Sequence, residues 1–387
     1  MIASRLLAAV AALTAAVALA GCGTTPAPPV SAAAASAPPP PSLATSLATA
    51  GGTWAEVVMG GSVARHDNFW QLFARPAGAS RWNLVTPPGT ADNGGLILAA
   101  AGPSLIAGFR PSQDLTFSPL SATSDNGRAW SSDSPLDAPL ASAADALAAA
   151  PASENLLALL SDGTAMLAAP AYTSWKTLTT LRALAGTPAG RHCGLHALTA
   201  VAYTPSGLPL MAGTCARPGN AGIFADRDGV WQATGPAIPA TLARRPVAVI
   251  RLTRIAGQIT ALLVAGSGHD ATLLAAWSAD SGLHWMLSPV LGLGAGGVAS
   301  ASFGASGTVA MITTSGSAEL VPGERSPWRA LPAVPPGTAT LAPGPGGTTD
   351  ALAVRRGTLT VWQLAPGHSS WVRTQTIVVP IQYGSSG

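Results

Sequence analysis

The chain has 387 residues, of which 48% are hydrophobic and only 10% are charged, whereas roughly 25% of residues are charged in ordinary soluble domains. Its net charge of +3 is small and no long basic run occurs, which argues against nucleic-acid binding because such proteins carry concentrated basic patches. The 43 glycines and 34 prolines indicate a chain interrupted by many turns.

Residues 1–22 have the pattern of an export signal. Arg5 precedes an apolar run from Leu6 to Ala20, which is too short to span a bilayer comfortably. The run ends in Leu-Ala-Gly-Cys at 19–22 and resembles the lipobox of bacterial lipoproteins. This resemblance implies cleavage before Cys22, a lipid on its thiol, and an extracytoplasmic protein anchored in the cell membrane. An ordinary secretory signal is the alternative.

Residues 23–50 contain no charged and no aromatic residue and are rich in Ala, Pro and Ser. Such a segment buries too little apolar surface to offset the entropy lost on ordering. We therefore expect a disordered spacer that holds a folded domain, residues 51–387, away from the membrane.

Tryptophans recur through that domain at intervals of 43 to 56 residues, close to the 40–50 residues of a propeller blade; they are Trp82, Trp130, Trp175, Trp231, Trp285, Trp328 and Trp371. Each follows a turn-rich segment, and short apolar runs precede most of these turns. In the fifth repeat the runs 246–255, 258–267, 271–279 and 284–289 indicate four strands. The pattern predicts an all-β, seven-bladed β-propeller of four-stranded blades.

Two stretches, SATSDNGRAW (121–130) and WSADSGLHW (277–285), share the pattern Ser/Thr-x-Asp-x-Gly-x-x-Trp. This pattern resembles the Asp-box, or BNR repeat, of sialidases and sortilin-type receptors, which closes the hairpin between the third and fourth strands of a blade. The resemblance implies that Asp accepts backbone N–H groups, Gly takes a positive φ and Trp covers the hairpin. These structural roles fall on Asp125, Gly127, Trp130, Asp280, Gly282 and Trp285.

The first repeat lacks one strand. In this repeat only three segments, 53–61, 68–76 and 81–87, have the pattern of a strand. At the other end of the chain, the segment 378–384 follows the strands that the last blade needs and has no blade of its own. We expect this C-terminal strand to complete blade one, because the pairing would remove the free edge of an open ring.

Cys193 and Cys215 flank a predicted hairpin, so that their ends can meet. In an oxidising exterior we expect a disulfide between them. The alternative is a metal site that uses His192 and His196.

The sequence offers no catalytic residue, metal site or cofactor site, since it has no nucleophile elbow, phosphate-binding loop or dinucleotide motif. A sialidase would need an arginine triad, a Tyr–Glu pair and an Asp. The chain has three tyrosines and four glutamates, and GFRPSQ at 108–113 matches the Phe/Tyr-Arg-Ile-Pro motif of that family only in part. A divergent, sialidase-like glycoside hydrolase remains the alternative to a binding or scaffold module.

Arginines give the only indication of a ligand. The pairs Arg244-Arg245 and Arg355-Arg356 fall in loops expected at the end of the propeller where pockets form. Arg binds carboxylate and phosphate groups, so that an envelope glycopolymer or an acidic protein surface is the expected partner. Solvated loop charge is the alternative. Arg75, Arg128 and Arg325 are assigned to the opposite end.

Overall fold

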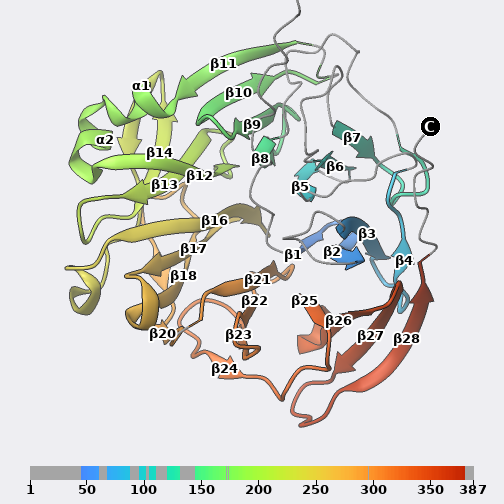
Figure 1. Cartoon of the computed structure of the whole chain (residues 1–387). Coiled ribbons are helices and arrows are strands. Elements are labelled where there is room, and N and C mark those ends of the chain that lie inside the picture. Colours follow the sequence, from blue (N-terminus) through green and yellow to red (C-terminus); the bar gives the residue numbers. More distant parts are fainter. Residues whose placement is uncertain are drawn as a thin grey trace, which may run out of the picture. The chain divides into compact units, whose positions relative to one another are not determined.

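The computed structural model describes residues 45–60, 68–87, 96–101, 104–109, 120–130, 144–170, 172, 174–294 and 296–379. Most regular elements in these ranges are β-strands (Figure 1). No helix within them is long and apolar enough to cross a membrane. The predicted signal peptide with Cys22 and most of the predicted spacer lie outside the described residues.

The strands pair into consecutive antiparallel groups. The first three groups are β1 (Thr45–Thr49), β2 (Gly52–Gly60), β3 (Asn68–Pro76) and β4 (Asn83–Leu84); β5 (Leu96–Ala101), β6 (Ser104–Phe109) and β7 (Leu120–Thr123); and β8 (Ala144–Ala149), β9 (Leu156–Leu160), β10 (Thr164–Ala168) and β11 (Trp175–Thr180). The fourth is β12 (Leu195–Tyr203), β13 (Pro209–Cys215), β14 (Gly222–Arg227) and β15 (Val230–Ala233).

The fifth group is β16 (Val247–Ile255), β17 (Gln258–Ala265), β18 (Thr272–Ser278) and β19 (Met286–Leu287), with β20 (Leu291–Gly292) also paired to β18. The sixth is β21 (Val298–Phe303), β22 (Val309–Thr313), β23 (Ala318–Val321) and β24 (Arg329–Ala330). The seventh is β25 (Thr338–Pro343), β26 (Thr349–Arg355), β27 (Thr358–Leu364) and β28 (Val372–Val378). Short pairings also join the first group to the sixth, through β1 and β21, and the fourth to the fifth, through β13 and β16. The predicted fold is all-β, but two short helices, α1 (Leu181–Ala185) and α2 (Pro188–Cys193), connect β11 to β12.

Two hairpins show how local sequence sets the pairing. The turns Ala256-Gly257 and Arg356-Gly357 have positive φ at both residues, which is the geometry that matches the twist of antiparallel strands. Each turn leaves only two residues between the paired strands. The register then places alternate side chains on the two faces of each sheet.

The core lies between sheets and not within one. Buried clusters join each group to the next, for example Val249, Leu263 and Leu274 of the fifth group with Leu210 of the fourth. One further cluster contains Phe73 and Trp82 of the first group together with Leu352 and Val361 of the seventh. Face-to-face packing of consecutive antiparallel sheets is the packing of a β-propeller.

The structure corrects the prediction for the missing strand of the first group. β1 pairs with β2 through Leu47 and Trp54, and β3 occupies the other edge of β2. The C-terminal segment therefore cannot fill this gap, and the part of it beyond 379 lies outside the described residues. The predicted spacer also extends too far, since 45–49 forms a strand (Figure 1).

β1 has the composition of a linker, but its hydroxyl side chains bond to distant parts of the chain. Thr45 Oγ1 donates to the carbonyl of Ala301, and Ser46 Oγ donates to the carbonyl of Leu341 at 2.8 Å. In addition to its pairing with β2, the strand is thus bonded to partners about 250 to 300 residues away. Local composition does not reveal such partners.

Candidate functional site

The first repeated motif builds a turn after β7. Asp125 Oδ1 accepts the backbone N–H groups of Arg128 at 2.9 Å and Ala129 at 3.0 Å, and the Thr123 hydroxyl at 2.9 Å. Gly127 has a φ of 79°, a conformation that favours glycine. Trp130 Nε1 donates to the Val85 carbonyl at 2.7 Å, which ties this turn to the preceding group. The hydrogen bond from Ala129 is the main cause that lowers the Asp125 pKa.

The second motif repeats the geometry between β18 and β19. Asp280 accepts the backbone N–H of His284 at 2.8 Å and the Ser278 hydroxyl at 2.9 Å. The His284 backbone bond and its ring contact lower the Asp280 pKa to about 2. Gly282 has a φ of 85°, and Trp285 Nε1 donates to Thr234 O at 2.6 Å. A carboxylate held in this way is ionised at neutral pH and does not supply a proton.

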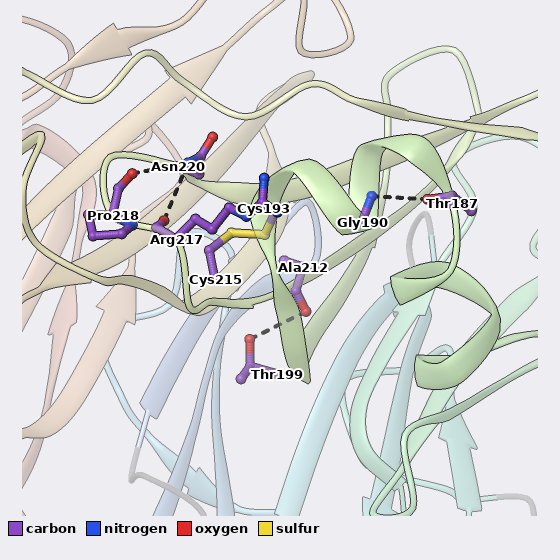
Figure 2. Close-up of a disulfide and its surroundings, with 9 residues drawn as sticks. All are labelled: Thr187, Gly190, Cys193, Thr199, Ala212, Cys215, Arg217, Pro218 and Asn220. Atoms are coloured by element: carbon purple, nitrogen blue, oxygen red, sulfur yellow. Dashed lines mark hydrogen bonds between the residues drawn. A yellow bond between two sulfur atoms is a disulfide. The ribbon is translucent and has the colours of Figure 1, made fainter.

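The predicted disulfide is present and joins Cys193 to Cys215 with a Cα–Cα distance of 5.1 Å (Figure 2). It fastens the end of α2 to the end of β13. Thr187 caps α2 by accepting the N–H of Gly190 at 3.0 Å. Both sulfurs are bonded to each other, so that neither thiolate is available to join His192 and His196 as a metal ligand.

The structure does not bring the two arginine pairs together. Arg244 is exposed in the loop before β16, and the Arg245 guanidinium donates to the carbonyl of Asp270. Arg355 ends β26 and Arg356 lies in the following turn. Strand direction places both pairs at the same end of their respective sheets, but none of the four side chains lines a described cavity.

A small cavity of about 80 Å³ lies among the first strands of several groups. Its lining includes two carboxyl side chains, Glu56 and Asp145, and the guanidinium of Arg251. Ligand pockets typically have volumes of about 300 Å³ or more, so this cavity is smaller than a typical ligand pocket.

A buried polar cluster lies where the first and seventh groups meet, and sequence reasoning missed it. Arg75 Nη1 lies 2.5 Å from Asp350 Oδ2, and both side chains are at least 93% buried. Trp82 Nε1 donates to the same oxygen at 2.9 Å, while Gln363 donates to Asp350 Oδ1 at 3.1 Å. Arg75 lies at the end opposite the arginine pairs, as predicted, but its side chain is buried in this cluster.

A cavity of about 430 Å³ adjoins this cluster. Loops of the first, sixth and seventh groups line it, and Arg75 and Arg329 are its charged residues. The glycine- and proline-rich segment 343–348 forms one side. The glycines and prolines of this segment are residues that indicate a loop.

No protein-family model and no curated protein matches the chain. Among solved structures, a protein from Lactobacillus plantarum is 9% identical with a TM-score of 0.51, over 84% of this chain and 96% of that chain. YCF48 from Cyanidioschyzon merolae is 13% identical with a TM-score of 0.45, over 80% and 95%. The Aleuria aurantia lectin, a six-bladed β-propeller, is 13% identical with a TM-score of 0.38, over 88% and 96%.

At such low identity the likeness to the Lactobacillus plantarum protein concerns the fold alone. The other two structures have TM-scores below 0.5 and support no argument about this chain. The packing of successive antiparallel sheets nevertheless defines the class, which is an all-β protein of the β-propeller type.

Proposed function

We propose that this chain is a seven-bladed β-propeller lipoprotein of the extracytoplasmic side of a cell membrane. It acts as a binding or scaffold module for an envelope ligand or protein. Cys22 carries the lipid, and the segment between Cys22 and β1 is the spacer. The Cys193–Cys215 disulfide supports an oxidising compartment, because disulfides persist outside the cytosol.

The observation that carries this proposal is the use of the repeated aspartates. The carboxylates of Asp125 and Asp280 accept backbone N–H groups within their own turns. This use supports the turn-building role that the Asp-box resemblance implies for them. The loops that these rigid sheets hold in place are the parts of the molecule available for recognition.

The two arginine pairs are the proposed contact with an anionic partner. Arg244-Arg245 and Arg355-Arg356 are mostly exposed, and exposed guanidinium groups bind carboxylate or phosphate weakly and in a salt-dependent manner. The partner is an anionic glycopolymer or an acidic protein surface of the envelope.

A pull-down from crosslinked cell envelope tests this proposal. Alanine at all four positions is expected to reduce the recovered material and its salt sensitivity. The matched control replaces Arg128, Arg227, Arg325 and Arg373, which removes the same charge elsewhere. If the two quadruple variants recover the same material as the wild type, the arginine pairs are only solvated loop residues.

Glycoside hydrolysis remains the second candidate on one observation. Glu56 and Asp145 both line the central cavity, and hydrolysis of this kind uses two carboxyl groups. The cavity volume of about 80 Å³ and the presence of Arg251 in its lining give this candidate less support than binding. Hydrolysis of a fluorogenic sialoside that Glu56→Gln abolishes would favour it.

A further inference from the structure

We propose that the cavity between the first, sixth and seventh groups binds the carboxylate of a small, singly charged ligand with an uncharged body. This inference goes beyond the proposed function, because the cavity lies at the strand ends opposite the arginine pairs. The two sites can therefore fail or succeed separately.

Turns from three sheets build the cavity. The β1–β2 turn and the β3–β4 turn contribute from the first group, the β21–β22 loop from the sixth, and residues 343–348 from the seventh. All of these turns join a first to a second strand or a third to a fourth strand. They consequently lie at one end of their sheets, as the loops around a propeller end do.

Arg75 supplies the central donor. Its Nη1 is engaged by Asp350, and its guanidinium carbon lies 5.3 Å from the centre of the Trp82 ring. Its other terminal nitrogen, Nη2, is buried and has no hydrogen-bond acceptor among the described residues. A buried N–H donor without an acceptor is costly, and a ligand oxygen in the adjoining cavity would satisfy it.

Gly344 lies beside this nitrogen. A Cβ atom built on Gly344 would lie 3.0 Å from Arg75 Nη2 and 2.5 Å from Thr348 Oγ1. Any larger residue would thus cover the donor. The φ of Gly344 is −109°, so that the backbone itself does not require glycine here.

The charge of the cavity favours a monoanion. Arg329 is exposed at the rim, and none of the described residues that line the cavity is Asp or Glu. Asp350 already neutralises Arg75, which leaves one net positive charge among these three side chains. A carboxylate balances that charge, whereas a phosphate dianion would leave an excess negative charge in a partly buried site.

The walls indicate the body of the ligand. Four alanines, four prolines and Leu320 form the apolar part, and five glycines and five Ser or Thr side chains form most of the rest. Several of these hydroxyls already donate to backbone carbonyls, such as Thr308 to Pro322 O at 3.0 Å and Thr348 to Pro345 O at 2.9 Å. A volume of about 430 Å³ suits a ligand of one ring or of two amino-acid residues.

A fluorine-NMR titration of the purified full chain tests the site with two probes of equal shape. We expect 4-fluorobenzoate to bind and 4-fluorobenzamide, which lacks the charge, to bind at least tenfold more weakly. Unlabelled benzoate should displace the labelled probe, while inorganic phosphate at equal ionic strength should not. Equal affinity for both probes would overturn the proposal, and stronger displacement by phosphate would replace the carboxylate with a phosphate ligand.

Variants then locate the binding. Gly344→Ala should abolish binding, and Arg329→Gln should weaken it about two- to fivefold, as expected for an exposed charge. Arg373→Gln, which removes an exposed arginine outside the cavity, should bind as the wild type does. Circular dichroism melting verifies that each variant is folded. Folded Gly344→Ala that binds normally, or equal losses in Arg329→Gln and Arg373→Gln, would place the ligand elsewhere.

Discussion

Removal of the Asp350 carboxylate should destabilise the contact between the first and seventh groups severely. Asp350 pairs with Arg75, and both side chains are almost fully buried. Loss of one partner from a buried ion pair costs about 3–5 kcal/mol, because the other charge stays buried and unpaired. Asp350→Ala also deprives Trp82 Nε1 and Gln363 Nε2 of their acceptor, which adds about 1 kcal/mol or more.

The expected loss for Asp350→Ala is therefore about 4–6 kcal/mol, a large share of the roughly 5–15 kcal/mol that stabilises a typical domain. Urea unfolding, followed by circular dichroism and by tryptophan fluorescence, measures it. Asp350→Asn keeps one acceptor oxygen and should lose about half as much. The double variant Arg75→Met/Asp350→Leu removes both charges, so that it should be more stable than Asp350→Ala.

Two results would refute this reasoning. A loss below about 1 kcal/mol in Asp350→Ala would mean that water reaches Arg75 and that the pair is effectively a surface ion pair. If the double variant Arg75→Met/Asp350→Leu were less stable than Asp350→Ala, packing and not the unpaired charge would dominate the contact.

Three other perturbations have defined outcomes. Cys22→Ala should release the protein from the membrane fraction or stall its processing, and unchanged mass and fractionation would exclude the anchor. Deletion of 41–50 should lower the melting temperature far more than deletion of 23–40, because only the former removes β1 from the edge of β2; equal melting temperatures would contradict this role. The Asp280 pKa of about 2 lies below its ordinary 3.8, so the stability it contributes is present above about pH 4 and is lost as the pH falls towards 2. Asp280→Asn should lack this acid-dependent component in pH-jump unfolding, and an identical pH profile would show that the turn does not depend on the carboxylate.

The strands of most groups could be predicted because their cause is local. In 246–289 the apolar runs, the glycine turns and the Asp-x-Gly-x-x-Trp pattern occur within short windows, and the strands β16–β19 follow them. The disulfide was predictable for the same reason, since the strands between its cysteines bring their ends together.

The candidate cavity could not be predicted because its cause is not local. Arg75 and Asp350 are separated by 275 residues; a closed ring places their sheets side by side, but nothing in either segment indicates that these two side chains pair. An arginine before a Pro-Ala-Gly turn reads as a surface residue. β1 was not predicted because its composition is that of a linker; besides its local pairing with β2, it is held by contacts with the sixth and seventh groups that lie far away in the sequence.

Arg75 takes part in both the contact between the first and seventh groups and the proposed carboxylate site, which couples ligand binding to stability. Its Nη1 is engaged by Asp350, and the residue lines the cavity, so that a ligand on the proposed donor Nη2 binds only the folded arrangement. A ligand present at ten times its dissociation constant should then stabilise the fold by about 1.4 kcal/mol. We expect 4-fluorobenzoate at that concentration to raise the urea midpoint of the wild type and of Arg373→Gln, but not of Gly344→Ala. A rise of equal size in Gly344→Ala would show that the benzoate acts through some other part of the surface.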